Sequence, residues 1–127
     1  MAVTIADTDV LIDFLRGSGA AARVETVLAT GRLGTTAVAA FELRQGVDGP
    51  AAERAVDALL GALLVLPLTA DAARRAGQVR RRLRRAGADI GVADGLVAGI
   101  CLAHAATLMT RNRAHFERVE GLALAPG

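Results

Sequence analysis

Lysine, tyrosine and tryptophan are absent from this chain of 127 residues, and phenylalanine occurs only three times. Every permanently cationic side chain is therefore an arginine, and the core has to be built mainly from alanine, valine, leucine and isoleucine. Without tyrosine or tryptophan, stacking platforms for single-stranded bases are scarce. A nucleic acid could then be recognised only through its backbone and its shape.

The chain has a single cysteine, Cys101, which excludes an intramolecular disulfide and argues against a cysteine-based metal site. Its apolar neighbours indicate a small buried residue in a helix. The longest apolar stretches fall short of the ~20 residues that span a bilayer. Acids at positions 7, 9 and 13 interrupt the N-terminal apolar stretch. We therefore expect no signal peptide, no membrane segment and a cytoplasmic location.

The bulk composition predicts one folded domain that covers residues 1–127. The chain is 53% hydrophobic and only 22% charged, which excludes a disordered protein. Its length allows one real core and is too short for two ordinary domains. The net charge is only +2, but a sequence pI near 9.9 and clustered arginines favour an anionic partner.

Short apolar runs that are typical of strands alternate with helical patterns. The predicted strands are Val3–Ala6, Leu33–Thr36, Val65–Leu68, Thr107–Thr110 and Leu122–Leu124. The predicted helices are Thr8–Arg16, Ala20–Thr30, Val38–Gly46, a segment that starts at Gly49-Pro50, Ala70–Ala86 and Val92–Ala105. This alternation predicts an α/β domain with a short, mostly parallel central sheet of four to five strands flanked by helices. Glycines at 91, 95 and 99 predict that the last helix presses against another backbone.

Three acids lie in apolar surroundings far apart in the chain. Asp7 directly follows the first predicted strand, and open α/β sheets bind their ligands at that end of a strand. Glu42 and Asp94 lie within apolar helices. Buried carboxylates need a partner, and three of them together would favour Mg²⁺ or Mn²⁺. The residues alone leave open that Asp94 only favours a helix N-terminus and that Glu42 faces solvent.

Two further acids, Asp9 and Asp13, belong to the first predicted helix. The simplest interpretation makes both of them solvated surface acids, because charged residues are rarely buried. Asp89 precedes the last long helix, where a position on a surface loop is the simplest interpretation.

Four segments, at residues 3–17, 36–43, 90–98 and 108–122, occur in a recognisable order. The first reads VTIADTDVLIDFLRG and the last LMTRNRAHFERVEGL. Together they resemble PIN-domain ribonucleases, specifically the VapC toxins of bacterial toxin–antitoxin pairs. This resemblance implies a PIN-like fold and a metal-dependent endoribonuclease that leaves a 5′-phosphate and a 3′-hydroxyl. It further implies a homodimer and a small VapB-type antitoxin that covers the site.

The resemblance also assigns roles to individual residues. Asp7, Glu42 and Asp94 match the acids that hold Mg²⁺ or Mn²⁺. Asn112 stands where the family often has a fourth acid, so one metal ion is better supported than two. The catalytic set is then Asp7, Glu42, Asp94 and Asn112. Supporting roles around it fall to Thr8, Asp9, Thr110 and His115.

Seven arginines crowd the predicted helix Ala70–Ala86. Guanidinium groups match phosphate oxygens well, and a basic face speeds association with RNA. The predicted RNA-binding residues are Arg80, Arg81, Arg84, Arg111 and Arg113. A solvated helix surface and a contact with an acidic antitoxin tail remain alternative interpretations.

Two other functions compete with the nuclease. The segment Asp7-Thr8-Asp9-Val10 is also similar to the start of haloacid-dehalogenase-type phosphatases, but those enzymes generally need a lysine near the phosphate and this chain has none. The remaining alternative is a non-catalytic, dimeric α/β binding module with incidental acids.

Overall fold

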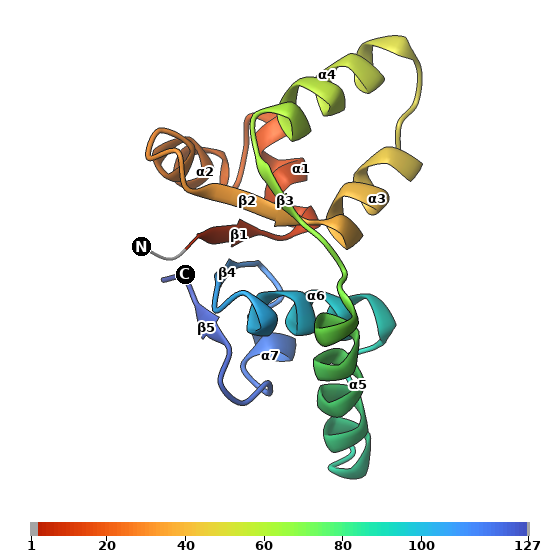
Figure 1. Ribbon diagram of the computed structural model, residues 1–127. Helices are drawn as coiled ribbons and strands as arrows, with labels where there is room; N and C mark the ends of the chain where they lie inside the picture. Colours follow the sequence, from red (N-terminus) through yellow and green to blue (C-terminus); the bar gives the residue numbers. More distant parts are fainter. Residues whose placement is uncertain (1–2, 127) are drawn as a thin grey trace.

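The computed structural model describes residues 3–126, which form one twisted sheet between two layers of helices (Figure 1). The strands are β1 (Thr4–Ala6), β2 (Leu33–Thr36), β3 (Leu64–Leu66), β4 (Thr107–Met109) and β5 (Ala123–Leu124). Their order in the sheet is β3-β2-β1-β4-β5, and every neighbouring pair is parallel. The predicted α/β architecture is confirmed.

Seven helices connect the strands within the described residues. They are α1 (Thr8–Arg16), α2 (Ala21–Leu28), α3 (Ala37–Gln45), α4 (Pro50–Gly61), α5 (Ala70–Arg85), α6 (Val92–Ala103) and α7 (Arg113–Phe116). Six agree with the sequence prediction to within a few residues. The four-residue helix α7 was not predicted. Strand β3 ends before Pro67, earlier than predicted, because proline has no N–H to donate to a sheet.

The middle strand β1 brings the ends of three strands together. Its residues pair with β2 on one side and with β4 on the other, up to Ala6 opposite Met109. The backbone N–H of Asp7 then donates to the carbonyl oxygen of Met109 at 3.0 Å. Because the strands are parallel, the residues that follow β1, β2 and β4 all emerge at one edge of the sheet.

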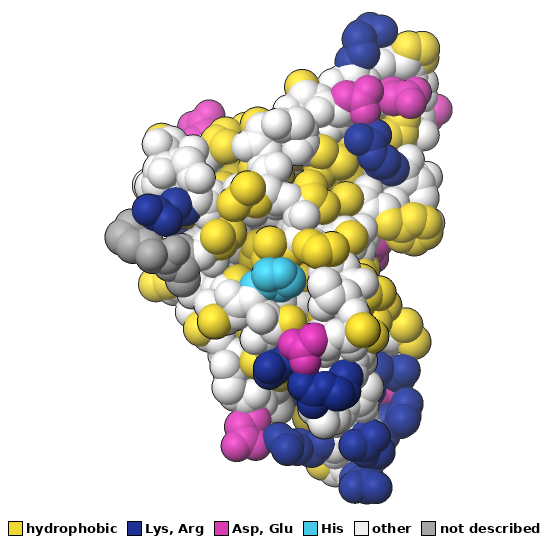
Figure 2. Space-filling model, viewed as in Figure 1, with side chains coloured by type: hydrophobic (Ala, Val, Ile, Leu, Met, Phe, Trp, Pro, Cys, Tyr) yellow, Lys and Arg dark blue, Asp and Glu magenta, His cyan; other side chains and the backbone are white. Residues whose placement is uncertain are grey.

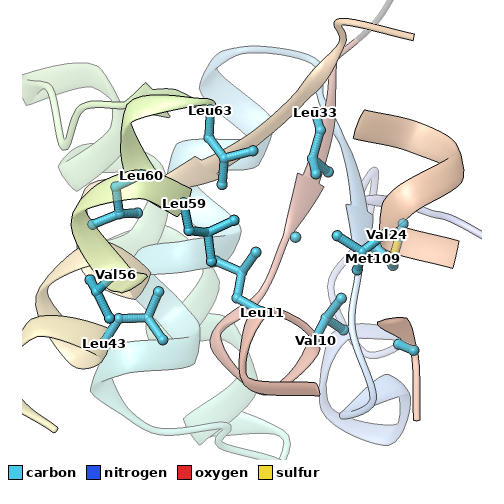
Figure 3. Close-up of a cluster of buried hydrophobic side chains, with 12 residues drawn as sticks. Val10, Leu11, Val24, Leu33, Leu43, Val56, Leu59, Leu60, Leu63 and Met109 are labelled. Atoms are coloured by element: carbon cyan, nitrogen blue, oxygen red, sulfur yellow. The ribbon is translucent and has the colours of Figure 1, made fainter. Parts of the chain in front are cut away.

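Each face of the sheet has its own hydrophobic cluster. The first cluster packs α1, α2 and α4 against the sheet, with residues such as Leu11 and Leu59 in its interior (Figure 3). The second cluster packs α5, α6 and α7 against the opposite face, around Val97 and Phe116. Along β1, Ala6 belongs to the first cluster and Ile5 to the second, as strand alternation requires.

Helices α5 and α6 approach each other closely, as two of the three glycines predicted. A Cβ atom on Gly99 would lie 2.7 Å from the Cβ of Ala76, and one on Gly95 would lie 2.6 Å from the Cγ of Arg80. Gly91 has another role, because it precedes α6 with a φ of 88°. The two contacts show that α5 runs antiparallel to α6. The C-terminal half of α5 therefore lies beside the first turn of α6.

Within residues 3–126, none of the helices combines the length and the apolar character that crossing a bilayer requires.

Candidate active site

The carboxylate of Asp7 is buried at the end of β1, with only 7% of the residue exposed. One oxygen accepts a hydrogen bond from the Thr8 backbone N–H at 2.8 Å, and the other accepts one from the Thr110 hydroxyl at 3.0 Å. Burial raises the pKa of Asp7 from 3.8 to about 6, and the negative charges of Asp94 and Asp9 add to this. The two hydrogen bonds oppose the rise in pKa but are outweighed.

Glu42 is tied to the same region through Thr8. The Thr8 hydroxyl donates to Glu42 Oε1 at 2.7 Å, across 34 residues of sequence. Helix α3, which carries Glu42, begins directly after β2, and the hydroxyl of Thr36 caps it by accepting from the Ala39 N–H at 3.1 Å. The helix start is fixed in this way, and Glu42 is partly buried rather than free in solvent.

Asp94 lies in the first turn of α6, where two polar side chains meet it. The Asn112 amide donates to Asp94 Oδ2 at 2.8 Å, and Nδ1 of His115 lies 2.8 Å from the same oxygen. The backbone N–H of Asn112 donates to the Thr110 hydroxyl at 3.0 Å, and that hydroxyl in turn donates to Asp7. The segment after β4 therefore bridges Asp7 and Asp94.

One continuous hydrogen-bond network thus joins the predicted catalytic residues and all but one of the predicted supporting residues. Its members are Asp7, Thr8, Glu42, Asp94, Thr110, Asn112 and His115. Asp9 is outside the network, because its side chain is exposed on α1. It acts on the site only through its charge, which raises the pKa of Asp7.

The acids do not form a ready-made cage for an ion. Within residues 3–126 there is no group of three or more His, Cys, Asp or Glu side chains placed to hold one metal ion. Thr8 lies between Asp7 and Glu42, since its backbone N–H donates to Asp7 and its hydroxyl donates to Glu42. The segment from Thr110 to Asn112 bridges Asp7 and Asp94. Shared binding of one metal ion by the three acids stays a prediction.

The interpretation of Asp13 as a solvated acid is wrong. This residue is 5% exposed, and its Oδ2 accepts from the Ala20 N–H at 3.1 Å. Its Oδ1 lies 3.4 Å from Nη1 of Arg111, which follows the end of β4. Asp13 therefore ties the turn between α1 and α2 to the loop that carries the site. Gly17 and Gly19, both with positive φ, form the turn that brings the Ala20 N–H to Asp13.

The predicted RNA-binding arginines separate into paired and unpaired side chains. Arg80 forms two hydrogen bonds to Asp89, at 3.2 and 2.7 Å, and holds the pKa of Asp89 at about 2. Arg113 donates to the Ala125 carbonyl at 2.6 Å, and Arg111 contacts Asp13. Arg81 and Arg84 are exposed and have no hydrogen bond or ion pair within the described residues. Asp89 is therefore a structural partner of Arg80, which its sequence position did not reveal.

Comparison with known proteins places these features in a family. Residues 4–122 match the model of the PIN domain. Ribonuclease VapC10 of Mycobacterium tuberculosis is 40% identical over 120 residues, which are 93% of this chain and 89% of that protein. The tRNA(fMet)-specific endonuclease VapC of Shigella flexneri is 30% identical, over 91% of both chains.

The fold agrees with this sequence evidence. The crystal structure of DNA-bound VapBC from Salmonella typhimurium matches with a TM-score of 0.85 and 28% identity, over 98% of both chains. VapBC-1 from nontypeable Haemophilus influenzae matches with a TM-score of 0.84 and 25% identity, over 97% of this chain and 96% of that one. The chain therefore belongs to the PIN-domain family and, within it, to the VapC ribonucleases.

Proposed function

We propose that this chain is an RNA-cleaving toxin of a toxin–antitoxin pair that hydrolyses phosphodiester bonds with the help of a divalent metal ion. The observation that carries the proposal is the network that joins Asp7, Glu42 and Asp94 at one edge of the sheet. The family match supports ribonuclease activity. The same match argues against the two alternative functions, the phosphatase and the non-catalytic binding module.

The donor groups at this edge fit Mg²⁺ or Mn²⁺. Carboxylate and amide oxygens are the hard ligands that these ions prefer, and Mg²⁺ needs only one or two carboxylates beside several waters. Burial is the main cause of the raised pKa of Asp7 and disfavours its ionised form, which a bound cation would stabilise. Asp7 and Asp94 would hold the ion, with Glu42 within reach through water. When bound, the ion would supply charge compensation for the phosphate and help to deprotonate the attacking water.

The remaining residues of the network position these acids. Thr110 donates to Asp7 and accepts from the Asn112 backbone, so it fixes the strand end and the following loop together. The Asn112 amide nitrogen faces Asp94, which leaves the amide oxygen of Asn112 available for water or an ion. Because Asn112 is neutral, we propose one metal ion rather than two. His115 helps to orient the same oxygen of Asp94, and its Nδ1 also lies 2.8 Å from the Asn112 amide nitrogen.

The partner that the comparisons support is a VapB-type antitoxin. Similar chains from Salmonella typhimurium and Haemophilus influenzae occur in VapBC complexes. We propose that the antitoxin silences this chain by covering the edge of the sheet where Asp7 and Asp94 lie.

We also propose a homodimer, formed through an apolar patch beside α3. Phe41 and Val92 are each 61% exposed, and Leu68 is 43% exposed. These three side chains line a hollow of about 410 Å³ that an isolated chain would leave open to water. We expect the Phe41→Asp variant to be monomeric in light scattering after gel filtration. A dimer of unchanged stability would contradict the choice of this patch.

Cleavage of RNA by the purified chain tests the proposed function. We expect products with a 5′-phosphate in the presence of Mg²⁺, none with a chelator, and none from the Asp94→Asn variant. The matched control is Asp48→Asn, which removes an exposed acid outside the network and should cleave normally. Metal-independent cleavage, or full activity of Asp94→Asn, would contradict the proposal. Trapping by beryllium fluoride would instead favour the phosphatase.

A further inference from the structure

The seven arginines of α5 are not equivalent, because four of them form ion pairs with three acids. Asp71 pairs with Arg74 at 2.6 Å and with Arg75 at 2.9 Å. Arg80 pairs with Asp89 at 2.7 Å, and Arg82 with Glu120 at 2.6 Å. The other three, Arg81, Arg84 and Arg85, are exposed and have no hydrogen bond or ion pair within the described residues.

These three unpaired arginines, which we name the α5 arginine triad, share one face of the helix. Their spacing of three and four residues places their side chains together over the last two turns of α5. This face points away from Ala72, Ala76 and Leu83, the buried residues of the same helix. Figure 2 shows arginine side chains gathered over the end of the molecule where Figure 1 draws α5. Three neighbouring cations repel one another, so an anionic partner would stabilise them.

The surface beside the triad suits a phosphate backbone better than a protein partner. Arg81 and Arg85 line a hollow of about 560 Å³ together with Gln78, Arg82 and Ala86. This hollow has no large apolar or aromatic side chain among its lining residues. Protein interfaces usually bury such anchors at their centre, whereas contacts to phosphate oxygens need only guanidinium groups.

The position of the triad relative to Asp94 fits an extended substrate. Arg80 packs its stem over the position of Gly95, the residue that follows Asp94. Arg84 is one turn beyond Arg80, about 6 Å along the axis of α5. The triad therefore lies beyond the contact between Arg80 and Gly95, toward the end of α5 that extends away from the sheet (Figure 1), and none of its members belongs to the hydrogen-bond network around Asp94.

We propose that Arg81, Arg84 and Arg85 bind the phosphate backbone of the RNA substrate outside the cleaved bond and set its affinity rather than the rate of cleavage. The inference rests on the proposed ribonuclease function. The Arg80–Asp89 pair, by contrast, holds the loop that leads into α6.

A pair of double variants tests this proposal. Arg81→Gln/Arg85→Gln removes two charges from the triad, and Arg74→Gln/Arg75→Gln removes two arginines of the same helix that share an ion pair with Asp71. Binding of a fluorescein-labelled RNA stem-loop is measured over a range of potassium chloride concentrations, with Asp94→Asn added to both proteins and to the reference so that none cleaves. Thermal stability is measured on each, because arginines also favour a helix C-terminus.

We expect the triad variant to bind about tenfold more weakly and to lose about 1.5 from the slope of log affinity against log salt, since each phosphate contact contributes roughly 0.7–0.9. The control should keep the slope of the reference. With Asp94 intact, the triad variant should show a KM raised about tenfold and a kcat within about twofold.

Equal losses in both double variants, or no loss in either, would overturn the proposal. So would a fall in kcat with unchanged RNA affinity. If the triad variant binds RNA normally but loses affinity for an acidic antitoxin, the surface belongs to a protein partner and the proposal is wrong. Absence of cleavage by the unaltered chain, with triad-dependent RNA binding intact, would contradict the nuclease function and leave the RNA contact standing.

Discussion

Replacing Asp7 with asparagine should abolish cleavage and, at neutral pH without metal, stabilise the fold. The Asp7 carboxyl has a pKa of about 6 in the folded chain, whereas its ordinary pKa, which applies to the unfolded chain, is 3.8. The folded chain therefore holds this proton more tightly than the unfolded chain does. Ionisation of Asp7 costs stability, beginning as the pH rises above 3.8 and complete above about 6. An amide of the same shape has no charge to bury.

The size of this gain follows from the two pKa values. Their difference, at 1.36 kcal/mol for each pH unit, corresponds to about 3 kcal/mol at pH 7.5. Asparagine would realise only part of this gain in stability. Its carbonyl oxygen can still accept from the Thr8 N–H, but its NH₂ group is itself a donor and faces the Thr110 hydroxyl, which donates to Asp7 in the wild type. A net gain of about 1–2 kcal/mol is expected after the lost charge-assisted hydrogen bond.

Urea unfolding in the presence of a chelator measures this gain, at pH 7.5 and at pH 4.5. The advantage of Asp7→Asn should shrink by about 2 kcal/mol at the lower pH, where the folded wild type is already protonated. Asp48→Asn, which changes an exposed acid, should show no such pH dependence. Added Mg²⁺ should raise the unfolding midpoint of the wild type but not of Asp7→Asn. A variant that is less stable than the wild type at pH 7.5 would refute the reasoning.

Three further substitutions test the framework around the site. Gly99→Ala should destabilise the fold by about 1–3 kcal/mol, because its Cβ would overlap α5. Gly77→Ala has open space around the new Cβ and should raise the free energy of unfolding by about 0.5–1 kcal/mol. Urea unfolding compares the two variants. Arg80→Gln should lower kcat/KM about tenfold by releasing the loop before α6, and Arg80→Asp combined with Asp89→Arg should restore part of the loss. Asp13→Ala should cost about 1–3 kcal/mol by leaving a buried N–H without an acceptor, which an unchanged midpoint in urea would contradict.

Much of the fold was predictable because its signals are local. Apolar runs marked the strands to within a few residues, and Asp7 follows such a run directly, so its place at the edge of the sheet could be predicted. The close packing of two helices was also predictable from a local signal, the spacing of Gly95 and Gly99. The four residues of α7 are too few to show a helical period, so this helix was missed.

The partners of individual side chains were not predictable, because they depend on contacts between distant segments. Thr8 meets Glu42 across 34 residues, and Thr110 meets Asp7 across 103 residues. The burial of Asp13 depends on the turn after α1 and on Arg111 near the other end of the chain. Composition could not separate paired from unpaired arginines on α5, since Asp89 and Glu120 lie outside that helix.

The neighbouring inner strands β1 and β4 each pack against both helical layers. Ile5 and Leu108 face one layer, while Ala6 and Met109 face the other. Loss of either helical layer would therefore expose one face of the strands whose ends carry Asp7 and Thr110. Partly denatured molecules that still cut RNA should not accumulate, and heat or urea should extinguish catalysis and secondary structure in one shared transition.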